Sequence, residues 1–367
     1  MNVFICCTPI QIVRAVYMKI AMTEFQDMAD IYVAPVFHNA PMIMDNLQTS
    51  GLFHAVYSLE TAELTRAASA RLLYGCNQLA RQIRSASYQK IIAFNIDSPF
   101  INALYTKNRH NKDFEYHYVE DAPGMYKMYA PAKFPSFSPN KLLQIQQPYY
   151  HAAGYWFSYP DFMETPGVDS PSIRKLPSVN IEDDTFVDLI NQIFDYAPDE
   201  TLNNADVLIM EESFYTDGKI PDNYDYTLFR EIRNRFPESK IAIKLHPRTK
   251  VNRFEQDFSI VQGTWIPWEL YVMNGLRQKQ HFPIQLGIAC SALTSDKFMF
   301  DAESLKIILA PLFQDKITKF EDGSSNVDTQ VIRRFEELQK TYQNPERMII
   351  AYNKSDLFDT LTSWLNQ

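Results

Sequence analysis

Short apolar runs alternate with amphipathic segments along most of this chain. The run at 3–7 ends at Thr8-Pro9, and the following segment at 10–20 repeats its apolar residues at helical spacing. Because strands that alternate with helices pair in parallel, this pattern predicts an α/β fold with helices on both faces of each sheet. The expected strands are 3–7, 31–36, 54–57, 90–94, 114–119, 207–210, 240–245, 282–289 and 306–312. The expected helices are 10–20, 61–85, 100–105, 181–196, 225–236, 327–342 and 355–365.

The alternation is interrupted over residues 129–178. This segment is rich in proline and aromatic residues and has little periodicity, which is typical of a long connection between domains. The chain has 367 residues, more than one hydrophobic core usually supports. We therefore predict two Rossmann-like domains with parallel sheets that face each other across a cleft. The first covers 1–178, including the connection from about 129, and the second covers 179–367.

Composition and charge exclude several classes of protein. A hydrophobic content of 46% with 22% charged residues is typical of a folded soluble protein. Asp and Glu outnumber Lys and Arg by 44 to 35, which argues against a nucleic-acid partner because such a partner requires a basic face. The four cysteines include no CxxC pair, so neither a disulfide scaffold nor a zinc site is indicated.

The chain shows no signal for export or for crossing a membrane. Its N-terminus enters an apolar run without a basic region or a cleavage site, and no segment is long and apolar enough for a membrane span. We therefore expect a cytoplasmic protein. Peripheral contact with a membrane surface, which needs only a modest patch, stays open.

Polar side chains follow the carboxyl ends of several predicted strands. The run at 241–245 ends at His246-Pro247-Arg248, where the proline stops the strand and holds the histidine in an extended backbone. Ligands bind at this edge of open α/β sheets. Each acid or hydroxyl, taken singly, is equally typical of an ordinary turn or helix cap. The polar residues at the other strand ends are Glu120 and Asp121, then Glu211, Glu212 and Asp217, then Ser291, Thr294 and Ser295.

The order of these motifs resembles glycosyltransferase family 52, the bacterial lipooligosaccharide sialyltransferases, with kinship to capsular polysialyltransferases. One segment differs from the family pattern, because Ala122 stands where the family usually has glycine. The resemblance implies a fold of the GT-B type. The matching segments are Cys-Thr-Pro-Ile-Gln at 7–11, Glu-Asp-Ala-Pro-Gly-Met-Tyr at 120–126, His-Pro at 246–247, Pro-Trp-Glu at 267–269 and Ser-Ala-Leu-Thr at 291–294.

The resemblance also implies an activity. Sialic acid, or a related nonulosonic acid, would pass with inversion from its CMP-activated donor to a hydroxyl of a bacterial surface polysaccharide or lipooligosaccharide. Neither a cofactor nor a metal is expected, since the sequence lacks the Asp-x-Asp motif of metal-dependent sugar transferases. By this resemblance a homodimer is plausible, as is attachment to the inner face of the plasma membrane.

The same resemblance assigns roles to the residues at the strand ends. Asp217 is the expected base for the acceptor hydroxyl, and Asp121, beside Glu120, is its rival, while Glu211 and Glu212 stay open. His246 would stabilise the leaving phosphate, because charge develops there as the glycosidic bond breaks. Glu269 would accept hydrogen bonds from the ribose. The other residues expected to bind the donor are Arg248, Ser291, Thr294, Ser295 and Gly124.

Two other functions remain compatible with the sequence. One is a glycosyltransferase of the same family that uses a UDP-hexose donor. The other is a non-catalytic protein of the same fold that binds a glycan or a nucleotide.

Overall fold

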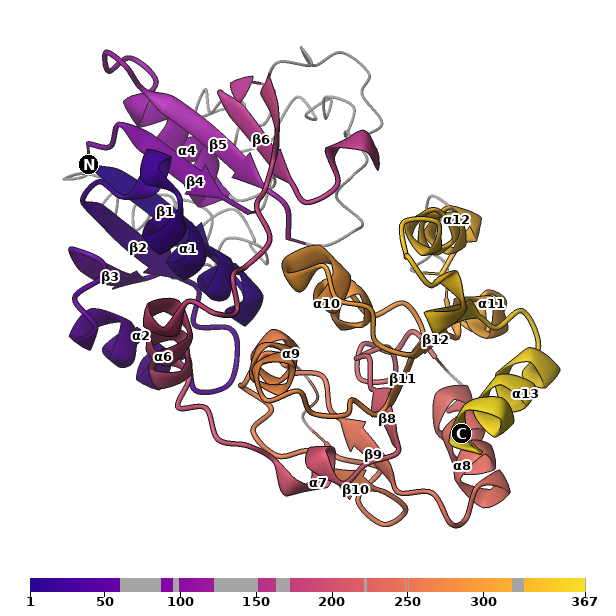
Figure 1. Cartoon of the computed structure of the whole chain (residues 1–367). Helices are drawn as coiled ribbons and strands as arrows, with labels where there is room; N and C mark the ends of the chain where they lie inside the picture. The colour runs from indigo at the N-terminus through magenta and orange to yellow at the C-terminus, as the bar shows by residue number, and fades with distance from the viewer. Residues whose placement is uncertain are drawn as a thin grey trace. The chain divides into compact units, whose positions relative to one another are not determined.

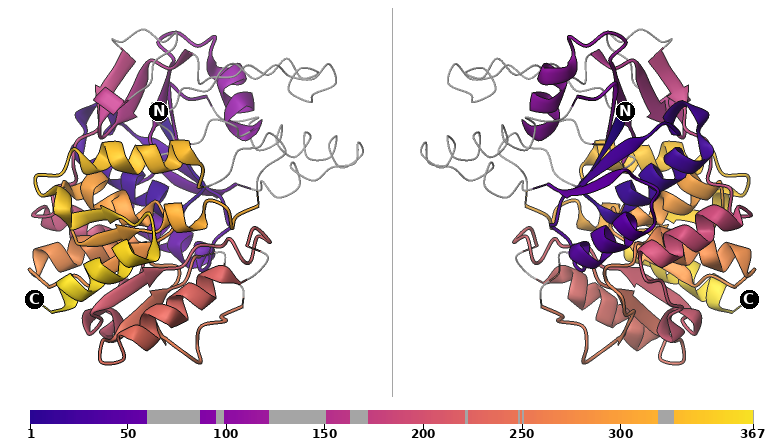
Figure 2. Two further views of the ribbon diagram at one scale, coloured as in Figure 1. Left: turned by 90° about the vertical axis from the view of Figure 1, so that its right-hand side faces the viewer. Right: turned by 90° about the vertical axis from the view of Figure 1, so that its left-hand side faces the viewer.

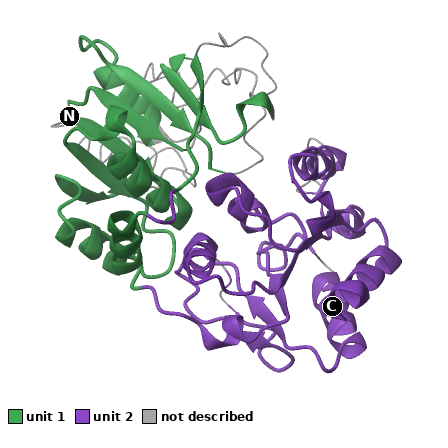
Figure 3. Ribbon diagram, viewed as in Figure 1, with its two compact units in different colours: residues 1–179, 183–195 green, residues 180–182, 196–367 purple. Residues whose placement is uncertain are grey.

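The chain folds into two compact units, which we describe from a computed structural model (Figures 1 and 3). Unit 1 comprises residues 1–179 and 183–195, and unit 2 comprises residues 180–182 and 196–367. Each unit is built on one parallel sheet, so the predicted α/β fold with two parallel sheets is confirmed. The structure describes residues 1–59, 87–94, 99–121, 151–162, 172–220, 223–247, 249, 251–318 and 327–366.

Unit 1 contains a parallel sheet of seven strands in the order β3-β2-β1-β4-β5-β6-β7. The chain moves outward from β1 to β3 and then returns to pair β4 with the other side of β1. Such a reversal opens a crevice at the carboxyl ends of the two strands, here β1 and β4. The strands are β1 Asn2–Cys6, β2 Ala29–Val33, β3 Ala55–Ser58, β4 Lys90–Ala93, β5 Glu115–Val119, β6 Gly154–Phe157 and β7 Ile173–Lys175.

Helices cover both faces of this sheet (Figure 2). Helix α1 begins at Pro9, where a proline costs no hydrogen bond, and it packs against α6 through the rings of Tyr17 and Phe186 at 5.2 Å. Helix α6 lies between the two segments of unit 2 in the sequence but belongs to unit 1. The helices of unit 1 are α1 Pro9–Ala21, α2 Ala40–Thr49, α4 Pro99–Asn108 and α6 Asp184–Ile193, with 3-10 turns η1 Thr23–Phe25 and η4 Pro160–Phe162.

Unit 2 contains a parallel sheet of six strands in the order β10-β9-β8-β11-β12-β13. Its strand order reverses between β8 and β11. The strands are β8 Val207–Met210, β9 Ile241–Lys244, β10 Ser259–Ile260, β11 Ile284–Gly287, β12 Lys306–Ile308 and β13 Met348–Ile350. The helices are α7 Glu200–Asn203, α8 Tyr224–Arg235, α9 Trp268–Arg277, α10 Ala292–Phe300, α11 Ala310–Phe313, α12 Thr329–Gln339 and α13 Lys354–Leu365, with the 3-10 turn η6 Pro345–Arg347.

Some predicted elements are wrong in length or type. The strand expected at 306–312 ends at Ile308, because Pro311 lies in the first turn of helix α11. The segment at 129–178 is more than a connection, since β6 and β7 extend the sheet of unit 1. The helix expected at 61–85 lies outside the described residues. In the part of the chain that the structure describes, no helix is long and apolar enough to cross a bilayer.

A buried ion pair fixes helix α10 to the start of β12. The Nζ atom of Lys306 lies 2.5 Å from Oδ1 of Asp296, and both side chains are almost fully buried. Burial lowers the pKa of Lys306, and the neighbouring Asp296 carboxylate opposes this effect. Each charge therefore depends on the other, because neither is hydrated.

We expect Lys306→Met to lower the free energy of unfolding by about 3–5 kcal/mol, because it leaves the Asp296 charge buried without its partner. The double variant Asp296→Asn, Lys306→Met should recover part of this loss, since no buried charge remains. Urea denaturation of both variants measures the difference. A single variant as stable as the wild type would contradict this account.

Candidate functional site

The carboxyl edge of the unit 2 sheet brings together several of the predicted residues. Strand β8 lies between β9 and β11, and the polar loops that follow these three strands emerge side by side. Adjacent strands are about 4.8 Å apart, so the three loops form one continuous surface. The predicted residues on these loops are Glu211, Glu212, His246 and Ser291.

Glu212 ties the end of β8 to the loop after β11. Its Oε1 atom accepts the backbone N–H groups of Ile288 and Ala289, each at 2.7 Å. Burial raises the pKa of Glu212 to about 8; the two backbone hydrogen bonds oppose this effect, and the adjacent Glu211 adds to it. Glu212 therefore positions this loop.

Glu211 makes the corresponding link to the loop after β9. Its Oε2 atom accepts the backbone N–H of His246 at 2.8 Å and the hydroxyl of Thr249 at 2.7 Å. Burial raises the pKa of Glu211, while these two bonds oppose the rise. The two adjacent acids thus hold two different loops, and Glu211 fixes the backbone from which the His246 ring projects.

Lys244 and Glu269 are both buried, and the charge of Glu269 acts on Lys244. The Nζ atom of Lys244 donates to the carbonyl of Ile266 at 3.2 Å and lies 5.6 Å from the ring centroid of Tyr271. Burial lowers the pKa of Lys244 to about 8, and the nearby Glu269 carboxylate opposes this effect. Glu269 is itself buried in the first turn of α9.

The N-terminus of α10 lies on the same edge of the sheet. Ser291 occupies the N-cap position, and its side chain makes no capping hydrogen bond. Thr294 and Ser295 donate their hydroxyl hydrogens to the carbonyls of Ser291 and Ala292, at 2.8 and 2.9 Å. The N–H groups of Leu293 and Thr294 donate to the carbonyls of Cys290 and Ser291 at 3.2 and 3.0 Å, so an anion at this end would compete with these bonds for the N–H groups of the first turn.

Asp217 lies apart from the buried groups. It is exposed on the turn after β8, and its Oδ2 atom accepts the hydroxyl of Ser213 at 2.9 Å. Gly218 continues this turn with a φ of 68°, in the left-handed region that glycine adopts readily. Arg248 and Gly124, both predicted to bind the donor, lie outside the described residues.

A second polar edge belongs to unit 1 and involves Glu120. Its buried carboxylate pairs with Arg14 of α1 at 2.8 Å and accepts the backbone N–H of Ser158 at 2.9 Å. The Ser158 hydroxyl also donates to it. Sequence reasoning missed Arg14, which interrupts the apolar face of α1 and could have indicated a buried partner.

Asp121 has a different environment, although it is the next residue. Burial raises the pKa of Asp121; a hydrogen bond from Gln11 and the charge of Arg14 oppose this effect. Its Oδ1 atom is shielded from solvent and has no hydrogen-bond partner among the described residues. Two adjacent carboxyl groups, one paired with arginine and one with a raised pKa, match the pattern of acid–base sites.

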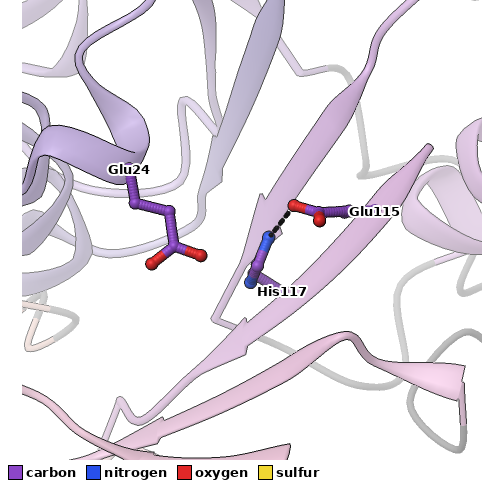
Figure 4. Close-up of side chains that lie close together, drawn as sticks. All are labelled: Glu24, Glu115 and His117. Atoms are coloured by element: carbon purple, nitrogen blue, oxygen red, sulfur yellow. Dashed lines mark hydrogen bonds and ion pairs between the residues drawn. The ribbon is translucent and has the colours of Figure 1, made fainter. Parts of the chain in front are cut away.

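A third cluster, at the amino edge of the unit 1 sheet, resembles a metal site (Figure 4). Potential ligand atoms of Glu24, Glu115 and His117 all lie within 4.8 Å of one another. However, Arg174 pairs with Glu24 at 2.7 Å, and Lys90 pairs with Glu115 at 3.3 Å. These two cations already neutralise both carboxylates.

The hydrogen bonds of His117 also favour a structural network over a metal site. The Nε1–H group of Trp156 points to Nδ1 of His117 at 3.3 Å, so Nε2 carries the hydrogen and donates to Glu115 at 3.1 Å. A metal on Nε2 would require the opposite tautomer, in which two N–H groups would oppose each other. The expectation that the function needs no metal stays a prediction.

No protein-family model matches this sequence, and no curated protein matches it. Solved structures do resemble it in fold. A UDP-GlcNAc 2-epimerase of Methanocaldococcus jannaschii, in complex with UDP-GlcNAc and UDP, aligns with a TM-score of 0.54 and 13% identity over 100% of this chain and 93% of that chain. S. aureus MnaA, in a structure with UDP, aligns with a TM-score of 0.55 and 11% identity over 100% of this chain and 88% of its own.

These comparisons overturn the family assignment made from the motifs. The resemblance to glycosyltransferase family 52 is wrong, because no family model matches and the similar folds include UDP-GlcNAc 2-epimerases. The CMP-sialic acid donor that it implied loses its support. The matching segments were short, and many α/β proteins carry acids, histidines and hydroxyls at strand ends. At this level of identity, the likeness establishes the fold.

Proposed function

We propose that the protein is a glycosyltransferase that uses a UDP-activated hexose. The observation that carries this proposal is the carboxyl edge of the unit 2 sheet. There a buried carboxylate, Glu269, and the N-terminus of α10 flank loops that Glu211 and Glu212 hold in place. Such an edge suits a nucleotide diphosphate, because helix N-termini favour phosphate and a carboxylate accepts hydrogen bonds from ribose hydroxyls. The two neighbours above, whose structures contain UDP, support the choice of nucleotide.

Several of the residues predicted from the sequence have a role in this proposal. The backbone N–H groups after Ser291 bind the phosphates, and His246 donates a hydrogen bond to the leaving phosphate as it gains charge. Asp121 takes the proton of the acceptor hydroxyl while that oxygen bonds to the anomeric carbon. The bond from this carbon to the phosphate oxygen breaks, and UDP leaves with the electron pair. Asp217 remains the alternative base.

The environment of Asp121 supports this choice of base. A raised pKa strengthens a carboxylate as a base near neutral pH, whereas the neighbouring Glu120 is held in an ion pair with Arg14. The proposed acceptor is a glycan hydroxyl.

Epimerisation of the sugar is the second candidate, because the similar folds include 2-epimerases. It would break a C–H bond and remake it from the opposite side, which requires two acid–base groups. Among the described residues of the unit 1 carboxyl edge, only Asp121 is an acid whose pKa is raised and which lacks an ion pair. The presence of one such acid, where epimerisation requires two acid–base groups, favours glycosyl transfer over epimerisation.

We expect UDP to bind the protein more tightly than CMP, as measured by isothermal titration calorimetry. Glu269→Gln should weaken UDP binding about ten-fold, because the amide replaces one accepting oxygen with a donor. Glu238→Gln removes an exposed acid in a turn of the same unit and serves as the matched control. Equal binding of CMP and UDP, or an unaffected Glu269→Gln variant, would refute the proposed nucleotide site.

Incubation with UDP-GlcNAc in heavy water separates the two reactions. Transfer to water or to an added glycan should release UDP without deuterium in the sugar, whereas epimerisation should place deuterium at C2. Asp121→Asn should lower turnover at least about 100-fold and leave UDP binding unchanged, since general-base catalysis contributes about 10²–10⁴. Asp217→Asn is the paired variant, and a larger loss there would transfer the role of base to Asp217.

The buried carboxyl group of Glu212 should give the protein a distinct dependence of stability on pH. Because its folded-state pKa is raised to about 8, its contribution to stability is full below its ordinary pKa and is lost as pH rises through 8. Urea denaturation at several pH values should show that Glu212→Gln removes this decline, since its amide oxygen can still accept both N–H groups.

Glu212→Ala gives the complementary result. Relative to Glu212→Gln, it should cost about 2–4 kcal/mol at every pH, because neither side chain titrates and two buried N–H groups lose their acceptor. Lys244 acts in the opposite direction, since its folded-state pKa is lowered to about 8 and stability then rises above that pH. The comparison therefore uses pH values below about 8. Parallel pH profiles for the wild type and Glu212→Gln would contradict the assignment.

A further inference from the structure

Unit 2 contains a cavity of about 390 Å³ at the edge opposite the candidate site. It is lined by residues that precede β11 and β12, by the last turns of α9 and by one side chain of α10. These elements are labelled in Figure 1. Much of its wall is apolar, through Val272, Leu276, Phe282 and Leu305. Its volume is within the usual range for small-molecule sites.

One buried polar atom in this wall has no partner. Gln285, the second residue of β11, is fully buried, and its Oε1 atom makes no hydrogen bond. The orientation of its amide follows from the neighbouring Ser304, whose hydroxyl donates its only hydrogen to Oδ2 of Asp296 at 2.6 Å. Ser304 must therefore accept from Nε2 of Gln285, at 2.7 Å. The amide oxygen of Gln285 is left to accept a hydrogen bond from an occupant of the cavity.

The two carboxylates of the wall are already paired with cations. Asp296 is bound by Lys306. Glu303 accepts Nζ of Lys297 at 2.9 Å and the backbone N–H of Gln343 at 2.7 Å. Each of the two carboxylates therefore has a cationic partner, although Lys297 also pairs with Asp301 at 2.7 Å.

The rim of the cavity is cationic. Arg347, Lys279 and His281 all line it, and the guanidinium of Arg347 is held there by a bond of 2.7 Å to the carbonyl of Glu303. Lys279 and His281 are exposed. Side chains with N–H groups at a cavity mouth favour an anionic group.

The backbone of Lys279 supports a functional reason for a cation at this place. Its φ is 51°, in the left-handed region, directly after the end of α9. Its N–H bonds to the carbonyl of Leu276, and the N–H of Gln280 bonds to that of Gly275. This arrangement is the Schellman motif, in which glycine is the preferred residue at the position of Lys279. A lysine here keeps a conformational strain that glycine would relieve.

We propose that this cavity binds a small hydroxyaryl carboxylate. The aromatic body packs on the apolar wall, the hydroxyl donates to Oε1 of Gln285, and the carboxylate lies at the rim beside Lys279 and Arg347. The site is independent of the proposed nucleotide site and of the reaction there.

Isothermal titration of the whole chain with matched probes tests this proposal. The probes are 4-hydroxybenzoate and the longer 4-hydroxycinnamate, with benzoate and cinnamate lacking the hydroxyl and 4-ethylphenol lacking the charge. We expect at least one hydroxy acid to bind about ten-fold more tightly than both its deoxy analogue and 4-ethylphenol, because each omission leaves one polar contact unmade. Saturating UDP should leave this binding unchanged. Failure of both hydroxy acids to bind, or displacement by UDP, would overturn the proposal.

Two variants separate binding from folding. Lys279→Gly should raise the melting temperature, because it relieves the left-handed strain, and should weaken the hydroxy acid about ten-fold through loss of the cation. Gln285→Met keeps the volume of the side chain and removes the unpartnered oxygen, so it should abolish the preference for the hydroxy acid over its deoxy analogue. Unchanged affinity in Lys279→Gly, or a preference retained in Gln285→Met, would show that these residues do not form the site.

Discussion

The carboxyl edge of the unit 2 sheet depends on one buried carboxyl group, that of Glu212. By accepting two backbone N–H groups from the loop after β11, it joins strands on both sides of the point where the strand order reverses. Parallel strands need no such link within the sheet, since their own ladders suffice. Beyond the last ladder bond, however, the N–H groups of the loops have no regular acceptors, so a side chain must provide them.

The adjacent residue, Glu211, performs the same task in the other direction. The two consecutive acids thus reach the loops on either side of β8. The unit 1 edge uses Glu120 similarly, tied to Arg14 and Ser158, and leaves Asp121 beside it with a raised pKa. In both units, then, one acid of a pair at a strand end clearly serves the backbone or an ion pair. The chemistry that we propose depends on Asp121.

The sequence was sufficient for the fold and for the location of the polar strand ends. Apolar runs identified β1, β8 and β9, because buried parallel strands need apolar side chains on both faces. It could not show that Glu211 and Glu212 bond to loops, since their partners lie 35 or more residues away in the chain. It also missed β6 and β7, whose few residues give too little periodicity among the prolines around them. The family assignment failed for a related reason. Short motifs of this kind occur at the strand ends of many α/β proteins, so they carry little information about ancestry.

The backbone of helix α9 carries no side chain at Gly275. A Cβ atom there would come within 2.6 Å of the Phe282 ring, so the ring can rest against the helix only because this residue has no side chain. Phe282 forms part of the cavity wall, and its position therefore sets the width of the opening. Replacing Gly275 with alanine would displace the Phe282 ring. The shape of the cavity would change with it, and so would the size of the molecules that could enter.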